Sequence, residues 1–170
     1  MAMKLGLRKF ALSVHLILSI GWIGAVIAFL ALGVCAAISN DAQAVRAAWI
    51  AMEVIGWAVI VPLAVGALLT GVVMSLATPW GLFHYYWVLI TLALTILSTV
   101  VLLLHMQTVS SMAEMARQME AGNHGGLGDL LHPALGLVIL LAVTLLNVYK
   151  PQGLTRYGWR KQQEERVPSR

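Results

Sequence analysis

Residues 54–113 read VIGWAVIVPLAVGALLTGVVMSLATPWGLFHYYWVLITLALTILSTVVLLLHMQTVSSMA and contain no Asp, Glu, Lys or Arg. A helix that crosses the hydrocarbon core of about 30 Å needs about 20 apolar residues, so this stretch can hold two membrane spans. It divides at Thr78-Pro79-Trp80-Gly81, because Pro and Gly favour a turn and Pro79 disfavours helix at Thr78. Only helices fit such single segments, since in lipid each must satisfy its own backbone hydrogen bonds.

Two further charge-free stretches flank this one, at residues 10–40 and 130–149, and each is long enough for one span. The sequence therefore predicts an all-α integral membrane four-helix bundle formed by a single domain, residues 1–170. The spans are expected near residues 9–37, 49–77, 86–105 and 131–149. Pro62 lies within the second span and should kink it, and Asn40 with Gln43 resembles a capping box before it.

The composition excludes most classes of soluble protein. Of the 170 residues, 60% are hydrophobic and 11% are charged, whereas a soluble domain has roughly 25% charged residues. Most of the surface should therefore meet lipid, and the lipid bilayer is the expected partner. The net charge of +4 comes from the chain ends, which argues for membrane topology and against nucleic-acid binding. No P-loop, Rossmann glycine pattern or nucleophile motif occurs in a suitable context.

The basic residues predict the orientation of the spans. Two lie in the longer loops, Arg46 and Arg117, and nine lie in the terminal segments, which are Lys4, Arg8, Lys9, Lys150, Arg156, Arg160, Lys161, Arg166 and Arg170. The positive-inside rule then places both termini in the cytoplasm, with residues 150–170 as a basic cytoplasmic tail. Interfacial aromatic belts are expected on the same side, formed by Trp80, Tyr85, Tyr86, Trp87, Tyr149, Tyr157 and Trp159.

Ionisable side chains at membrane depth are costly and mark candidate functional sites. The chain has five of them, which are His15, Glu53, His84, His105 and His132. A rise of 1.5 Å per residue puts His15 and His105 about 20 Å apart in depth, so they cannot both ligate one haem. Two groupings remain: an inner pair of His15 and His84, and an outer cluster of His105, His132 and Glu53. Alternatively, each side chain only hydrogen-bonds a neighbouring helix or marks the membrane boundary.

Methionines follow the third predicted span. Met112, Met115 and Met119 share one helical face, and Met106 is adjacent to His105. Soft thioethers beside a histidine could hold Cu(I), so His105, Met106 and Glu53 are the candidate metal ligands. The alternative is an amphipathic helix that lies against the membrane and turns its charged residues to water.

The first span contains His15-Leu-Ile-Leu-Ser-Ile-Gly-Trp22-Ile-Gly24. A histidine, a tryptophan seven residues later and then x-Gly resemble the first helix of several small bacterial membrane families. These are the copper-resistance D-like proteins, the membrane protoporphyrinogen oxidases of the HemJ type, and four-helix proteins of unknown function. The Thr78-Pro79-Trp80-Gly81-Leu82 loop and Trp87 look most like the last family, and this likeness runs through most of the chain.

The resemblance implies a multi-pass protein of the bacterial plasma (inner) membrane. In HemJ-type enzymes the first-helix histidine is associated with haem b, and the matching residue here is His15. Those enzymes also use basic residues within later helices, and none lies in the second to fourth spans here. This argues against protoporphyrinogen oxidation and leaves haem binding open. The likeness to copper-resistance proteins implies metal handling.

The leading hypothesis is a haem-binding or redox-related membrane protein. His15 is the first axial-ligand candidate, with His84 as its partner and Trp22 beside the site, while His105 and His132 form a separate outer site. The alternatives are a copper or other metal handler and a non-catalytic helical subunit of a homo-oligomer or membrane complex. These hypotheses leave open whether the protein is an enzyme.

Overall fold

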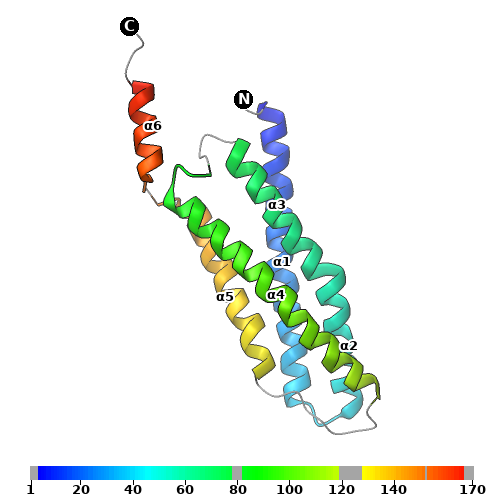
Figure 1. The fold of residues 1–170 in the computed structure, drawn as a ribbon. Coiled ribbons are helices and arrows are strands. Elements are labelled where there is room, and N and C mark those ends of the chain that lie inside the picture. The colour runs from blue at the N-terminus through cyan, green and yellow to red at the C-terminus, as the bar shows by residue number, and fades with distance from the viewer. Residues whose placement is uncertain (1–3, 78–81, 119–127, 152, 167–170) are drawn as a thin grey trace.

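The computed structural model describes residues 4–77, 82–118, 128–151 and 153–166, and in these ranges the chain is helical and has no strand (Figure 1). The elements in chain order are α1 (Leu5–Ile38), α2 (Ala42–Ile55), the π-helical turn η1 (Gly56–Ile60), α3 (Val61–Ala77), α4 (Tyr86–Gln118), α5 (Gly128–Tyr149) and α6 (Arg156–Arg166). Four of the helical stretches are long and apolar enough to cross a membrane, namely Leu5–Ile38, Ala42–Leu76, Tyr86–Gln118 and Leu130–Tyr149. The prediction of an all-α protein with four such helices is confirmed.

The four apolar helices pack side by side as a helical bundle. α1 packs against α2, α3 and α5, and α4 packs against the same three helices. α1 and α4 therefore lie diagonally opposite each other in the bundle. The continuous span of α2, η1 and α3 lies on one side between them, and α5 lies on the other. The start of α1 lies at the same end of the molecule as α6 (Figure 1).

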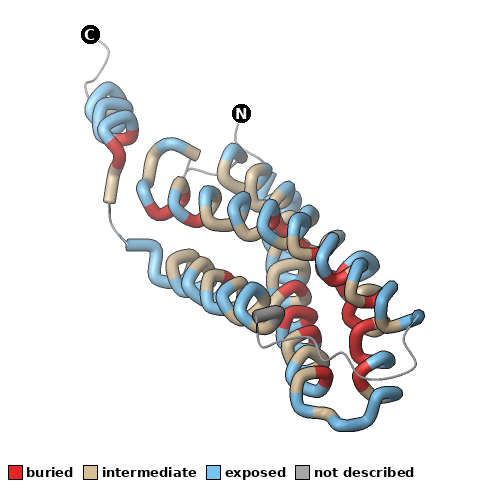
Figure 2. The backbone as a smooth tube through the Cα atoms, turned by 60° about the horizontal axis from the view of Figure 1, so that its bottom comes forward, coloured by how far each residue is buried: buried red, intermediate tan, exposed pale blue. Residues whose placement is uncertain are grey.

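The main hydrophobic cluster lies away from that end of the molecule, where Trp87 and Val88 are buried separately at the start of α4. α1 has no buried residue before Trp22, and α3 has none after Ala67. Figure 2 shows most of the buried residues along the other half of the bundle, with a few at the start of α4 and beside α6. Many of them are small, which lets helix backbones approach closely where lipid supplies no hydrophobic drive for association. These small buried residues include Ala36, Ala48, Ala64, Ala67 and Ala113.

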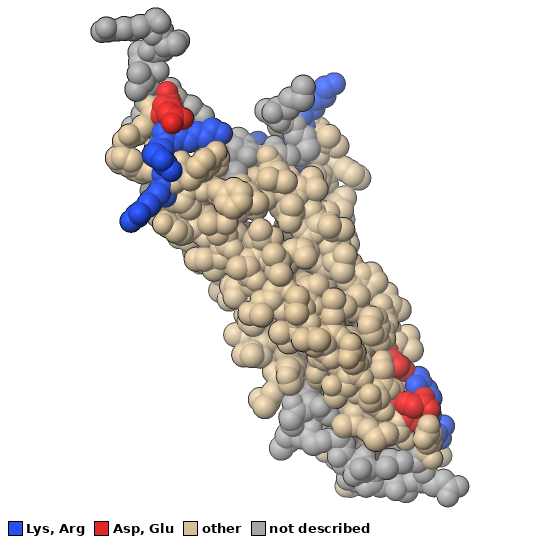
Figure 3. Space-filling view, in the orientation of Figure 1, with Lys and Arg blue, Asp and Glu red and all other residues tan. Residues whose placement is uncertain are grey.

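The outer surface of the bundle is apolar. Large hydrophobic side chains are exposed on every apolar helix, including Ile17, Leu69, Leu104 and Leu135. Figure 3 shows Lys, Arg, Asp and Glu at the two ends of the molecule and none on the face between them. A surface of this kind would be a severe liability in water but matches the hydrocarbon core of a bilayer.

α4 is longer than the sequence predicts. It continues past the expected end of the third span at His105 to Gln118. The extension packs against α2, where the Trp57 indole donates to Ser110 Oγ over 3.0 Å. Met106, Met112 and Met115 therefore belong to α4, and the helical face expected for Met112 and Met115 is part of the extension of the third apolar helix. Met119 lies outside the described residues.

The second span has a capped start and an irregular turn before Pro62, close to where the sequence predicts a cap and a kink. Asp41, not Asn40, caps α2, and its carboxylate accepts the Gln43 amide proton over 2.9 Å. Further along, the disturbance expected at Pro62 takes the form of η1, in which the Val61 amide donates to the Gly56 carbonyl. Proline has no N–H to continue the α-helical ladder, so the register shifts in the turn that precedes it.

Part of the predicted basic tail is an ordered helix. α6 follows a short segment that pairs with the start of α4 through the Tyr85–Leu154 bridge and a 2.9 Å bond from the Thr155 amide to the His84 carbonyl. Of the expected aromatic belt, Tyr86, Tyr149, Tyr157 and Trp159 are exposed, whereas Trp87 is buried. Trp80 lies outside the described residues.

Candidate functional site

Two of the predicted site histidines lie against each other. The ring of His105 on α4 stacks on that of His132 on α5, with centroids 4.8 Å apart and planes inclined by 20°. Phe29 on α1 meets His105 edge-on at 6.4 Å. His105 is half-buried and His132 is exposed. The similar depth that helical rise assigned to these two histidines is thus realised as direct contact between α4 and α5.

These imidazoles line a cavity of about 170 Å³ between α1, α4, α5 and η1. Trp22 and Phe29 contribute from α1, Ile60 from η1, and Leu140 from α5. The predicted cofactor-binding residue Trp22 therefore does share a site with His105 and His132, although it lies on the helix that carries His15. Apart from the two histidines and Ser98, the lining side chains are apolar or aromatic.

Ser98 is a candidate site residue that the sequence did not indicate. Its hydroxyl is buried, lines the cavity, and has no hydrogen-bond partner among the described residues. Its neighbours on α4 behave differently, because Thr95 and Thr99 bond to the carbonyls of Thr91 and Thr95. A buried polar atom without a partner is uncommon in native proteins and points to an absent water or ligand. Hydroxyl residues are frequent along α4, so only the rotation of the helix singles out Ser98.

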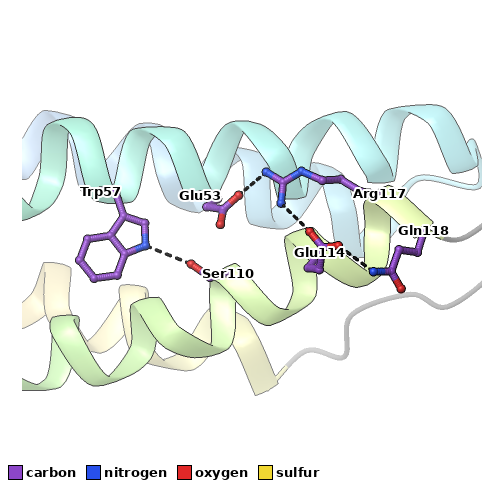
Figure 4. Close-up of polar contacts among 6 residues, drawn as sticks. All are labelled: Glu53, Trp57, Ser110, Glu114, Arg117 and Gln118. Atoms are coloured by element: carbon purple, nitrogen blue, oxygen red, sulfur yellow. Dashed lines mark hydrogen bonds and ion pairs between the residues drawn. The ribbon is translucent and has the colours of Figure 1, made fainter.

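Glu53 does not join the histidines, which corrects the predicted outer cluster. Its carboxylate pairs with the Arg117 guanidinium, which also bonds Glu114 Oε2 at 3.3 Å (Figure 4). The side chains are 20% and 38% exposed for Glu53 and Arg117. The sequence predicts that Arg117 lies in a loop, and its position opposite Glu53 depends on the extension of α4. Glu53 thus joins the ends of α2 and α4.

Of the candidate copper ligands, Glu53 lies apart, whereas His105 and Met106 both line the cavity. Met106 is fully buried, and its thioether lies against Gly56, occupying the space where a Cβ on that glycine would stand. Within the described residues, no group of three or more His, Cys, Asp or Glu side chains could hold a metal ion. Copper binding stays a prediction that rests on His105 and on the nearby methionines alone.

His15 lies in the loosely packed half of the bundle, between α1 and α3. Its Nδ1 is 2.9 Å from Thr70 Oγ1, and that hydroxyl donates its proton to the Gly66 carbonyl at 2.7 Å. In the tautomer that carries its proton on Nδ1, the ring donates to this hydroxyl and keeps a lone pair on Nε2. The ring sits against Gly71, where a Cβ would come within 3.3 Å of it.

His84 has different neighbours from His15, so the structure does not form the predicted inner pair. Its ring meets Tyr157 of α6 edge-on at 5.5 Å, and its carbonyl accepts from the Thr155 amide. His84 Nδ1 is buried without a hydrogen-bond partner among the described residues. The contacts of His84 attach α6 to the start of α4.

The comparisons with known proteins add no assignment. No protein-family model matches this chain, and no curated protein and no solved structure matches it. The function must therefore be argued from the site itself.

Proposed function

We propose that this protein binds a single-ring lipophilic quinone in the cavity beside His105 and His132. This is a specific form of the redox-related function that the sequence suggests. The observation that supports it most is the buried hydroxyl of Ser98, which has no partner in the described residues and lines an otherwise apolar cavity.

The size of the cavity selects the class of ligand. An apolar cavity of about 150 Å³ holds one benzene molecule, and the cavity here measures about 170 Å³. A porphyrin is several times larger than such a space. In addition, a histidine ligates iron through a nitrogen in the plane of its ring, so two face-stacked rings do not form an axial pair. One six-membered ring fits the site and a haem does not.

The polar groups that line the cavity differ in height along α4. Ser98 and His105 are seven residues apart on one face of α4, which corresponds to a rise of about 10 Å. A para-quinone carries a carbonyl oxygen at each end of a flat apolar ring. With hydrogen bonds of about 2.8 Å at each end, it spans a distance of this order. Ser98 then donates to one carbonyl, and His132 donates to the other.

The cavity also has a route for a lipophilic ligand. Three of its lining residues are exposed on the lipid-facing surface: Leu97 at 54%, Val101 at 38% and Leu135 at 64%. The opening thus lies between α4 and α5, where a molecule dissolved in the bilayer can enter and an alkyl tail can leave. A metal ion would have to lose its hydration shell to enter from lipid, which is costly. This favours a quinone over a metal ion as the ligand.

The test is a binding titration of the full chain in nanodiscs of zwitterionic lipid. A benzoquinone with a short alkyl tail should quench tryptophan fluorescence with saturation, and Trp22→Phe should remove much of that signal because Trp22 lines the cavity. We expect Ser98→Ala to weaken binding about tenfold, the equivalent of one hydrogen bond. His132→Phe keeps a ring for stacking but removes the donor, and should weaken binding similarly.

Ser111→Ala is the matched control, since Ser111 is an exposed serine on the same helix that bonds only the Gln107 carbonyl. Its affinity should equal that of the wild type. Non-saturable quenching that is the same in all variants would mean simple partition of the quinone into lipid, and the proposal would fail.

A second candidate is haem b bound through His15, as the helix 1 resemblance implies. The hydrogen bond between Nδ1 and the Thr70 hydroxyl supports it, because such a bond orients the ring and, when Nδ1 donates, leaves Nε2 able to ligate iron. When bound, the haem would supply one-electron redox chemistry. After haem supplementation, the purified protein should show a Soret band that His15→Ala abolishes and His132→Phe preserves. A wild-type spectrum without that band excludes this candidate.

We also infer that the protein lies in a bacterial inner membrane with both termini in the cytoplasm. The support is the gathering of Lys and Arg on α6 and at the start of α1, at one end of the molecule (Figure 3). The opposite end carries Arg46 and Arg117 together with Asp41, Glu53 and Glu114. Cytoplasmic segments are the ones that retain an excess of basic residues.

A further inference from the structure

Hydrogen bonds join the segment between α5 and α6 to the start of α4. The Tyr86 amide donates to the Gly153 carbonyl at 3.1 Å, and Thr155 Oγ1 bonds both the Phe83 carbonyl and, over 3.0 Å, the Gly158 amide. Gly158 is packed on the backbone of His84, where a Cβ would lie 3.0 Å from the His84 Cα. The surface between α6 and α4 is therefore a built feature and not a chance approach of a loose tail.

That surface is a groove of about 570 Å³ with cationic and aromatic walls. It is lined by Tyr86, Leu154, Thr155, Arg156, Trp159 and Arg160. Arg156, Trp159 and Arg160 follow the i, i+3, i+4 spacing, so they share one face of α6. The groove thus presents two guanidinium groups beside an indole and a phenol ring.

The charge of the groove is not balanced within the described part of the chain. Both ion pairs found there belong to Arg117, at the other end of the molecule, and neither Arg156 nor Arg160 meets a carboxylate. Like charges four residues apart on a helix repel each other. An anion between them would relieve this repulsion, and guanidinium groups bind phosphate through paired hydrogen bonds.

The groove adjoins the ends of two apolar helices, where lipid headgroups are expected. Tyr86 opens the apolar helix α4, and the neighbouring span α5 ends at Tyr149. Tyr86 and Trp159 are 52% and 57% exposed, and such amphipathic rings settle at the membrane–water interface. The nearest abundant source of phosphate at this depth is a phospholipid.

We propose that this groove binds the headgroup of an anionic phospholipid. Arg156 and Arg160 hold its phosphate, and Tyr86 and Trp159 flank the start of its acyl chains. A headgroup of net negative charge is favoured over a zwitterionic one, because the groove offers two cations and no acidic group for a choline or ethanolamine.

The test uses the full chain in detergent, labelled with a fluorophore at its single cysteine, Cys35, which is exposed on α1. Thermophoresis then measures the binding of dihexanoyl phosphatidylglycerol, dihexanoyl phosphatidylcholine and inorganic phosphate. We expect phosphatidylglycerol to bind at least about tenfold more tightly than either of the others. Arg156→Gln/Arg160→Gln should remove this preference.

Two further variants test whether lipid binding depends on the groove itself or only on the net positive charge of the protein. Lys9→Gln/Lys161→Gln removes the same charge from exposed positions outside the groove and should keep the preference. Gly158→Val displaces α6 from the His84 backbone while leaving both arginines in place, and should lose it.

The proposal is overturned if the two lipids bind equally tightly to the wild type. It is also overturned if Lys9→Gln/Lys161→Gln loses the preference for phosphatidylglycerol to the same extent as Arg156→Gln/Arg160→Gln. Inorganic phosphate binding as tightly as phosphatidylglycerol would replace the lipid by a soluble anion. A Gly158→Val protein that keeps its lipid preference would show that the groove is not the site.

Discussion

Met106 is completely buried, and its thioether fills the space that a side chain on Gly56 would need. This contact joins α4 to η1 at the edge of the cavity, since both Met106 and Ile60 line it. The sequence marks Met106 as a candidate copper ligand because it follows His105. In the structure both residues line the cavity, and the Met106 thioether packs against Gly56.

At this scale we predict that Gly56→Val destabilises the protein by about 1–3 kcal/mol, the usual cost of overpacking a core. The measure is the free energy of unfolding in mixed micelles of mild detergent and dodecyl sulfate. Combining Gly56→Val with Met106→Ala should recover part of the loss, because the two positions share one space.

Gly24→Val is the control for that series. Nothing lies within 4 Å of a Cβ at Gly24, which is exposed on α1. Its stability should stay close to that of the wild type. If both valine variants lose the same stability, the cost belongs to glycine replacement in a helix and not to the Met106 contact.

At the scale of elements, the sequence located every apolar helix but not the full extent of each. Charge-free runs mark where a helix can sit in lipid, whereas a helix itself ends where its hydrogen bonding and packing end. α4 therefore runs to Gln118, held by Trp57–Ser110 and Glu53–Arg117 contacts with α2 (Figure 4). These contacts join residues far apart in sequence, so no local pattern could reveal them.

α6 is a polar segment whose contacts with the rest of the chain also could not be predicted from local sequence. Residues 150–170 read as a basic tail because their charge and low hydropathy exclude a span. Only the pairing of residues 153–155 with the start of α4 orders α6, and that pairing depends on Gly158 having no side chain. It also turns scattered basic residues into a groove with two arginines on one wall.

At the scale of the whole molecule, an even number of spans requires both ends of the chain to lie on one side of the membrane. The start of α1 and α6 do lie at one end of the bundle (Figure 1). Which side of the membrane this end faces follows from the distribution of Lys and Arg.

We predict that both termini lie in the cytoplasm, and cysteine labelling in intact cells tests this orientation. Cys35 is first replaced by Ser, and single cysteines are placed at the exposed positions Asn40 and Gln163. A membrane-impermeant maleimide should label Asn40→Cys in intact cells but Gln163→Cys only after permeabilisation. The reverse pattern would invert the topology, and labelling of both in intact cells would contradict four spans.

The sequence by itself determined the fold class, the four apolar helices and the relative depth of each histidine. These follow from local physics, because charge is excluded from lipid and each residue adds a fixed rise to a helix. The shared level of His105 and His132, and the exclusion of a His15–His105 ligand pair, came from that rise alone.

Only the tertiary structure decided how each helix is rotated and which helices are neighbours. Rotation separated Ser98 from the other hydroxyl residues of α4, paired Glu53 with Arg117, and gave His15 the hydroxyl of Thr70 as its partner. In a chain whose spans are apolar on nearly every face, the periodicity that reports rotation in soluble helices is weak. The depth of each residue in the membrane could therefore be predicted from residues 54–113 and the charge-free stretches beside them. The side of each helix that points into the bundle could not.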